Sequence, residues 1–525
     1  MKFRKPSQLF RAVLVLSLTL AWALFSAAQS QQQTAAVGNA SVNASLGELQ
    51  SQVRELKEMV VQLQQQTAAS RQEISRLRQE LETQHTGGGS AYAAVAPGDE
   101  QSPSLSPAST AQLQQRLGNL EEDQQLLSGK IDDQYQTKVE SASKYRVRFS
   151  GMVLFNLFGN SGSVENQDVP TWGVRREPMD AAGSVGGTVR QSILGFEVFG
   201  PEVFGARSSG SINFDFGGGF PATYDGVNFG LVRLRTAAVR LDWKDNSIVA
   251  GQDQLFLSPL SPTSFASVIV PPLAYAGNLY SWTPQLRFEH RFTLSEGSNV
   301  TLQGGFQDPV TGEPPYNLDY VWYRSPDAGE YSRQPAYAAR VAYSHPMLGQ
   351  TLTLGAGGYY SRQNWGFNRI VNGYAATLDL NLPLSRAFTL SGAFYRGQAI
   401  GGLGTTLGRS VVYNGPLDDP NTLVQPLNTV GGWVQLKFRA NPKLEFNAAF
   451  GQDNPFAADI RAYGDQSQTY GNPFLTRNRG AFGNVIYRPR SDLLLSLEYR
   501  RLKTFTIYNS SYDAGQVNMS MGVLF

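Results

Sequence analysis

GQVNMSMGVLF, residues 515–525, is the stretch that decides the fold of this 525-residue chain. Apolar side chains alternate along it with polar or small ones, which is the period of a β-strand with one apolar and one polar face. A soluble domain rarely exposes such a strand at its edge, because an open edge invites aggregation. A transmembrane barrel closes its sheet and leaves no edge. The pattern therefore predicts a membrane-spanning β-barrel.

The two ends of the chain indicate the same compartment. Residues 1–28 combine a basic start, an apolar run and the small residues Ser26-Ala27-Ala28, which predict a secretory signal peptide. The apolar run is too short to cross a bilayer as an ordinary helix, so an uncleaved anchor is the weaker alternative. Phe525 resembles the aromatic signal by which bacterial outer-membrane barrels are recognised for assembly. We therefore expect the barrel-assembly machinery and outer-membrane lipid as partners.

Composition excludes several other classes of protein. The chain has no cysteine and only three histidines, and it contains no motif with the spacing of a catalytic nucleophile or a metal site. We expect no enzyme activity, no catalytic residue, no metal or cofactor, and no nucleic acid as a partner. Beyond the signal peptide, no apolar run reaches the roughly 18 residues that a membrane helix needs.

Residues 29–86 are predicted to form a coiled-coil stalk in the periplasm. Apolar residues recur there at spacings of three and four, interrupted only at Thr67 and Ser70. Val or Ile at the first core position with Leu at the second favours a parallel dimer in isolation, whereas a trimeric barrel would need three copies. A single helix packed on its own protein is the alternative. The predicted core is Leu46, Leu49, Val53, Leu56, Val60, Leu63, Ile74, Leu77 and Leu81.

Two further segments separate this stalk from the barrel. Residues 87–110 are rich in Gly, Ser, Pro and Ala, which is typical of a flexible linker. Residues 111–143 again carry leucines near heptad spacing and predict a short helical segment. From residue 144 the pattern becomes that of strands, and the net charge of the segment changes from negative to positive.

Residues 144–525 predict an all-β transmembrane barrel of 16 antiparallel strands. Short turns such as Lys244-Asp245 alternate with long connections, as in outer-membrane barrels with short periplasmic turns and long outer loops. A soluble sandwich is the alternative, but its last strand would be an open edge. The predicted strands are residues 144–158, 188–199, 205–216, 230–243, 246–256, 285–294, 299–307, 335–344, 351–361, 373–382, 386–396, 429–439, 443–451, 477–489, 491–502 and 515–525.

Alternation within the strands separates a lumen-facing side from a lipid-facing side. Arg287 and Glu289, for example, lie opposite Leu286. In residues 230–243 the alternation changes phase, which predicts a bulge near Thr236 to Ala238. The candidate pore-lining residues are Arg148, Asp215, Arg233, Arg235, Arg287, Glu289, Arg291, Lys437, Glu445, Glu498 and Arg500.

Arginine dominates the basic residues of the predicted barrel, with 27 Arg against 5 Lys in residues 144–525. A guanidinium stays charged and binds a carboxylate or phosphate at two points, so arginines in a lumen favour anions. In the alternative interpretation, these arginines pair with the 28 acidic residues of the same region and only solvate the barrel interior. The sequence predicts a mild rather than a strict anion preference.

The connection 257–284 differs from the other long loops. It contains five prolines and no charged residue, so we expect it to fold against another surface instead of standing in solvent. As the third outer loop it is a candidate constriction of the pore. A cover at a subunit interface or a latch over the rim is the alternative. The candidate constriction residues are Pro259, Pro262, Phe265, Pro271, Pro272 and Tyr275.

Two motifs give the chain a family resemblance. LRTAAVRLDW at residues 234–243, followed by IVAGQD at 248–253, resembles a strand–turn–strand signature of the DcaP-like outer-membrane porins, as does WTPQLR at 282–287. The resemblance implies a signal peptide, a periplasmic coiled coil and a trimeric barrel of 16 strands. It also implies uptake of small, often negatively charged organic solutes. The linker at 87–110 departs from the compact stalk of that family.

Two functions of different classes agree with these features. The first is a trimeric porin through which small hydrophilic solutes diffuse passively, with a mild preference for anionic organic molecules. The second is a structural protein, a plugged outer-membrane barrel whose coiled coil tethers the cell envelope. An open lumen distinguishes the first from the second.

Overall fold

The computed structural model describes residues 138–139, 146–219, 230–295, 297–313, 324–463, 475–508 and 510–525. The predicted signal peptide, coiled-coil stalk and linker lie outside these residues, as does nearly all of the predicted helical segment 111–143. Its residues Lys138–Val139 form the short strand β1, which pairs with β2, so a helix is wrong at these two positions. The chain divides into two compact units, Met1–Tyr135 and Gln136–Phe525.

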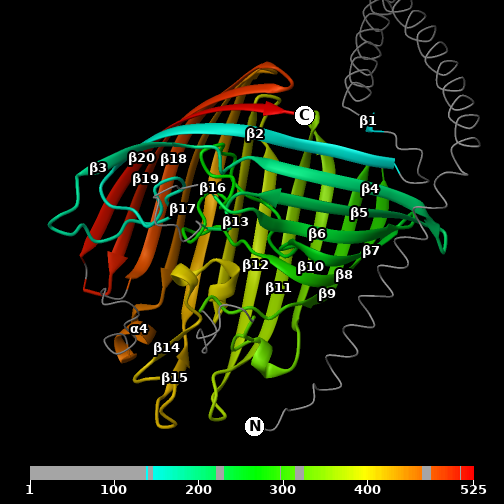
Figure 1. Cartoon of the computed structure of the whole chain (residues 1–525). Helices are drawn as coiled ribbons and strands as arrows, with labels where there is room; N and C mark the ends of the chain where they lie inside the picture. Colours follow the sequence, from blue (N-terminus) through cyan, green and yellow to red (C-terminus); the bar gives the residue numbers. More distant parts are fainter. Residues whose placement is uncertain are drawn as a thin grey trace, which may run out of the picture. The chain divides into compact units, whose positions relative to one another are not determined.

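Sixteen strands of the described residues form one closed antiparallel barrel (Figure 1). The ring closes because β2 pairs with β20 on one side and with β4 on the other. The sixteen strands are β2 (Arg146–Ser161), β4 (Ile193–Val203), β5 (Ala206–Asp215), β6 (Arg233–Asp242), β7 (Asn246–Gln254), β8 (Trp282–Ser295), β9 (Ser298–Gln307), β10 (Ala336–Met347), β11 (Gln350–Asn364), β12 (Ile370–Pro383), β13 (Phe388–Gln398), β16 (Asn428–Asn441), β17 (Leu444–Pro455), β18 (Leu475–Arg490), β19 (Leu493–Thr506) and β20 (Ser511–Leu524).

The predicted fold class is therefore confirmed for the barrel, and each of the sixteen predicted strands overlaps an observed one. Several smaller elements were not predicted. Strand β3 (Gly183–Thr188) continues the edge of β4 along β2. Strands β14 (Val411–Tyr413) and β15 (Val424–Pro426) form a separate hairpin. The short helix α4 (Ala457–Tyr463) and the 3₁₀ turns η1 (Glu330–Ser332), η2 (Gly401–Leu403) and η3 (Thr406–Gly408) lie in long connections.

The two ends of the barrel differ in the length of their connections. At one end the strands are joined by turns as short as Phe204-Gly205 and Leu348-Gly349, where both residues have positive φ, as a type I′ hairpin turn requires. Most connections at the other end are long. Figure 1 shows α4, β14 and β15 at this long-loop end and the carboxyl terminus at the opposite end. By the usual orientation of such barrels, the long-loop end faces outward.

The outer surface of the wall is apolar and the inner surface is polar. On β20 the side chains of Val517, Met519, Met521 and Val523 are about half exposed, at 47–57%, whereas Gln516, Asn518 and Ser520 between them are buried inside. The predicted division of faces thus holds for the strand on which the fold prediction rested. No helix among the described residues is long and apolar enough to cross a bilayer.

The phase change in β6 comes from a bulge, as predicted, but at a different residue. Asn213 pairs with Thr236 and Phe214 with Leu234, so Arg235 is the inserted residue, just before the predicted segment Thr236 to Ala238. Leu234 faces the lipid side, and Arg233 and Arg235 on either side of it both reach Asp215.

Phe525 completes the seam between the last and first strands. Its backbone amide donates to the Gly151 carbonyl at 3.1 Å, and the Gly151 amide donates to the Phe525 carbonyl at 2.8 Å. Its ring lies 5.1 Å from that of Phe149, which in turn lies 5.0 Å from Phe196 on β4. A Cβ at Gly151 would approach the Phe525 ring to 2.8 Å, so this position leaves room for the aromatic side chain.

Candidate functional site: a loop across the barrel lumen

The connection between β7 and β8, residues 255–281, runs inside the barrel. It begins and ends on one side of the ring, yet it forms hydrogen bonds with inward-facing side chains around the wall. The contacts run from Thr377 on β12 to Leu257, Gln435 on β16 to Thr263, Asn484 on β18 to Thr263, Glu498 on β19 to Ser264, Asn156 on β2 to Phe265 and Arg233 on β6 to Ile269, at 2.5–2.8 Å. A loop with these partners must cross the lumen.

Apolar patches on the inner wall explain why a loop without charge folds there. Leu273 and Ala276 pack on Trp433, Ala449 and Phe482 of β16–β18. Another part of the loop, Leu255 to Leu257 with Leu279, packs on Tyr359 of β11 and Tyr395 of β13. Phe265 and Val268 pack on Met152, Leu154 and Leu494 at the barrel seam. Burial of this surface, together with the polar contacts, fixes the loop.

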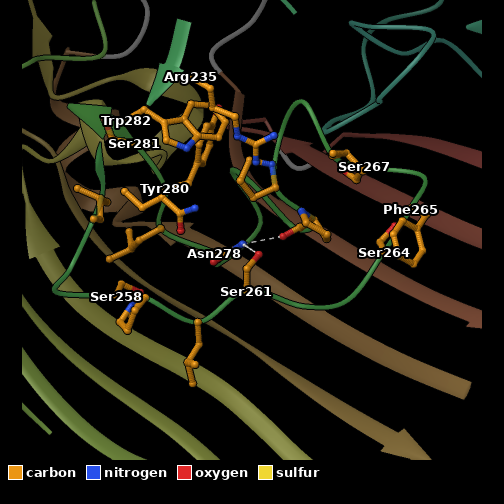
Figure 2. Close-up of a pocket in the computed structure, with 18 of the residues that line it drawn as sticks. Arg235, Ser258, Ser261, Ser264, Phe265, Ser267, Asn278, Tyr280, Ser281 and Trp282 are labelled. Atoms are coloured by element: carbon orange, nitrogen blue, oxygen red, sulfur yellow. Dashed lines mark hydrogen bonds between the residues drawn. The ribbon is translucent and has the colours of Figure 1, made fainter. Parts of the chain in front are cut away.

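The loop holds a tight local conformation. Leu273 and Tyr275 adopt positive φ values of 58° and 57°, and Gly277 one of 102°. A Cβ at Gly277 would come within 2.1 Å of the Gly432 carbonyl on β16, so only glycine fits this close approach to the wall. The buried Asn278 side chain donates to Ser261 and to the Pro272 carbonyl, joining the two limbs of the loop (Figure 2).

A cavity of about 300 Å³ lies between the two limbs of the loop and the wall. Serines at positions 258, 261, 264 and 267 line it, together with Arg235, Tyr280 and Trp282 (Figure 2). Apolar surface with a few polar groups is the usual lining of a site for a small organic molecule. The cavity therefore offers a cation and several hydroxyl groups to a small polar solute.

Two arginines share one carboxylate at this cavity. Arg233 contacts the fully buried Asp215 through two nitrogens, at 3.0 and 2.6 Å, while Arg235 lies 3.8 Å from the same carboxylate. Both guanidinium groups lie over the Trp282 ring, at 4.9 and 4.7 Å from its centroid. One nitrogen of Arg235, Nη1, is buried without a hydrogen-bond partner among the described residues. The group carries one uncompensated positive charge.

The connection from β2 to β3 packs against the loop between β7 and β8 from the long-loop end of the barrel. Trp172 meets Tyr275 edge-on, and Tyr275 meets Tyr280, with ring centroids 5.2 and 5.6 Å apart. Glu165 holds this connection in place by accepting hydrogen bonds from the Thr171 and Trp172 amides at 2.8 and 3.1 Å. Burial raises the pKa of Glu165 to about 7, although these hydrogen bonds oppose the shift.

The charged residues predicted for the lumen are brought together in ion pairs. Each of the predicted basic residues has an acidic neighbour. This is expected if the arginines pair with carboxylates and only solvate the barrel interior. Arg148 is the most open of them, with a side chain 56% exposed. The pairs are Arg148–Glu197 at 3.6 Å, Arg233–Asp215 at 2.6 Å, Arg235–Asp215 at 3.8 Å, Arg287–Glu289 at 2.8 Å, Arg291–Glu289 at 3.9 Å, Lys437–Glu445 at 3.4 Å and Arg500–Glu498 at 2.8 Å.

Several charged residues of the inner wall were missed in the sequence. Arg340 and Asp379 form a buried pair at 2.7 Å on β10 and β12. Their parity in the predicted strands 335–344 and 373–382 would have identified them. Arg240 contacts Asp242 and Glu289, and the bulge at Arg235 concealed its inward direction. Arg190 pairs with Asp168 at 2.8 Å between connections that no strand pattern marks.

The residues predicted to form the constriction lie on this loop in different settings. Pro259, Phe265, Pro271 and Pro272 line the cavity. Pro262 is buried, and Tyr275 joins the aromatic contacts with Trp172 and Tyr280. Among the described residues, no group of three or more His, Cys, Asp or Glu side chains is arranged to hold a metal ion.

Comparison with known proteins gives similarity of fold. No family model matches the chain, and no curated protein matches it in sequence. Among solved structures, the outer membrane channel DcaP of Acinetobacter baumannii has a TM-score of 0.56 and 15% identity over 74% of this chain and 100% of that chain. The sequence resemblance to that family is thus confirmed for the barrel fold. An anion-selective porin from Comamonas acidovorans has a TM-score of only 0.42 at 13% identity, over 73% of this chain and 100% of that one.

Proposed function

We propose that this protein is an outer-membrane porin through which small hydrophilic solutes diffuse passively, with a mild preference for anionic organic molecules. One observation carries the proposal. Inside a closed barrel, Arg233 and Arg235 share the single carboxylate of Asp215 at a cavity lined by an uncharged loop. A solute that passes the loop meets a positive charge and apolar surface together, which suits a small organic acid.

The paired charges of the remaining wall explain why the preference is mild. A basic residue whose carboxylate neighbour lies within 4 Å contributes little net potential to a pore. Arg287, Arg291 and Arg500 all have such neighbours in Glu289 and Glu498. We expect the charge excess at Asp215 to set the selectivity at the loop. Lys437 and Arg439 likewise share one carboxylate, that of Glu445.

Liposome swelling tests the transport function. Purified full-length protein in liposomes is expected to admit small sugars and salts of small organic acids, with faster swelling for the acids than for neutral solutes of the same size. Admission of sugars larger than a trisaccharide at the same rate would contradict a loop-narrowed pore. Liposomes that remain impermeable to all solutes would contradict the porin itself.

The alternative is a plugged barrel with a structural role. One observation favours this alternative. The loop contacts wall strands from β12 round to β6, as a segment that fills the lumen would. A plug that fills the lumen would keep the liposomes impermeable although the barrel is folded. Its coiled coil would then tether the envelope.

We further propose membership of the DcaP-like porins, with three copies in the membrane and a stalk in the periplasm. The shared barrel fold and the residues 234–243 and 282–287 support this proposal. The stalk lies outside the described residues, so its core from Leu46 to Leu81 remains a sequence prediction. A peptide of residues 41–86 is expected to sediment as a trimer, or as a dimer if the Val and Leu core decides alone. A monomer at high concentration would show that the seam binds another surface.

The Phe525 contacts lead to an assembly prediction. Phe525→Ala is expected to lower the amount of folded barrel in the outer membrane several-fold, because the ring packs on Phe149 at the seam that assembly must close. Heat-modifiable migration on gels measures the folded fraction. Leu524→Ala, next to it on the strand, is the control and should assemble nearly normally. Equal yields for wild type and Phe525→Ala would contradict a role in recognition by the assembly machinery.

A further inference from the structure

A cluster of cations lies on the outer surface of the barrel, away from the lumen. It consists of Arg477 and Arg479 on β18 and Arg501 and Lys503 on β19, which we call the β18–β19 basic patch. The neighbouring positions Asn478 and Leu502 are buried inside, so the four basic side chains have the parity of the lipid-facing side. This parity separates them from the pore-lining arginines.

The strand register aligns the patch in a row. Gln452 on β17 pairs with Arg479, Arg479 pairs with Lys503, and Lys503 pairs with Asp513 on β20. Arg501 lies at the preceding outward position of β19, two residues before Lys503, where it pairs with Ala481 and Gly515. The cations are therefore adjacent on two neighbouring strands instead of scattered over the surface.

The patch begins where the apolar belt ends. Along β19 the outward residues are Leu495, Leu497 and Tyr499, all at least 40% exposed, and then Arg501 and Lys503. The chain reaches the long-loop end beyond them, because β19 is followed by the connection to β20 on that side. The patch thus lies at the height of the lipid head groups in the leaflet that the long loops face.

Protein groups compensate the positive charge only in part. Asp513 is the carboxylate within ion-pair distance, at 3.4 Å from Arg501 and 3.5 Å from Lys503. Arg477 and Arg479 have no ion pair among the described residues, and the Arg477 Nε is buried without a hydrogen-bond partner there. Arg477, Arg479 and Lys503 all face the Phe505 ring, at 3.8, 5.3 and 5.6 Å from its centroid.

We propose that the β18–β19 basic patch binds the phosphate groups of a phosphorylated glycolipid in the outer leaflet, whose acyl chains lie along the apolar belt below. Each of the three arginines can bind a phosphate at two points, and the lysine adds a compact charge. Leu497, Tyr499, Val517 and Met519 provide the apolar surface directly below the patch. The proposal rests on the outer-membrane location of the barrel and is independent of whether the lumen conducts.

Lipid binding to the full-length protein tests the proposal. Detergent-purified, delipidated wild type is titrated with bisphosphorylated lipid A, with the same lipid after removal of its phosphates, and with inorganic phosphate. The wild type is expected to prefer the bisphosphorylated lipid by on the order of 100-fold over the dephosphorylated one, from several basic contacts acting together. The variant Arg477→Gln/Arg479→Gln/Arg501→Gln/Lys503→Gln is expected to lose most of that preference.

A charge-matched variant serves as the control. Arg175→Gln/Arg176→Gln/Arg333→Gln/Arg362→Gln also removes four exposed cations, from the long-loop connections and the outer face of β11, and should bind the lipid like wild type. Equal losses in both variants would overturn the proposal, since binding would then follow net charge alone. Binding of inorganic phosphate by the wild type without a preference for the phosphorylated lipid would also overturn the proposal. So would a patch variant that loses its oligomers but binds the lipid unchanged, because the patch would then be a contact between copies of the chain. Heat-modifiable migration on gels checks that each variant is folded. The single variant Arg479→Lys keeps the positive charge and should retain more of the lipid binding than the quadruple Gln variant.

Discussion

Deleting Pro262 to Tyr275 is expected to raise the single-channel conductance several-fold. This segment carries the contacts of the loop with β16, β18, β19 and β2, so its removal takes the loop out of the centre of the lumen. The barrel strands pair with one another and not with the loop, so the closed ring should persist. Recordings from single channels in planar bilayers measure the change.

The same deletion is expected to lower the thermal stability of the barrel. It removes Leu273, which covers Trp433 and Phe482 together with Ala276 in the intact protein. Deletion of Pro416 to Asn421, in the connection between β14 and β15, is the control and should leave conductance unchanged. If conductance stays the same but trimers fall apart, the loop is an interface latch, and the narrowing comes from the charged wall.

The second large effect is expected from Arg233→Gln/Arg235→Gln. The double variant should lose the anion preference and become neutral or cation-preferring, because Asp215 keeps its carboxylate while both guanidinium partners are gone. The reversal potential in a salt gradient measures this change. Arg148→Gln, at an exposed pair with Glu197 near the short-turn end, is the control and should shift the potential much less.

Asp215→Asn provides the opposite test at the same place. It leaves Arg233 and Arg235 without their shared carboxylate, so the anion preference should increase. Adding Asp215→Asn to the double Gln variant should bring the potential close to neutral and also relieve the buried, unpaired carboxylate. A reversal potential that does not change in any of these variants would show that the selective step lies elsewhere.

The sequence predicts the wall of this barrel well, because every strand obeys one physical constraint. Lipid on one side and water on the other impose a period of two, and residues 515–525 show this period in their sequence. The same constraint predicted the inward direction of Arg287 and Glu289. It also predicted a bulge in β6 but not its exact position. The bulged residue is Arg235, whose side chain type does not distinguish it from the other arginines of the strand.

The path of the loop could not be predicted to the same extent. Its lack of charge and its five prolines indicate that it folds against a surface, yet they do not identify that surface. The partners, such as Gln435 and Asn484, lie more than 150 residues away in the sequence and have nothing unusual in their own strands. The short strand β3 and the helix α4 were missed because neither is long enough to show a period.

Ion pairing is the other feature that alternation alone does not reveal. Parity places Arg233, Arg340 and Arg500 inside the barrel, but only the strand register shows which carboxylate each one meets. Beside the loop, two guanidinium groups meet the one carboxylate of Asp215.

The most direct test of the channel function is a recording of the wild-type full-length protein in a planar bilayer under a potassium chloride gradient. The lumen described here predicts steady open levels and a reversal potential displaced modestly toward that of chloride, because the loop faces Arg233 and Arg235. A correctly folded barrel that stays silent would contradict the porin. A reversal potential displaced toward that of potassium would contradict the role of the arginine pair.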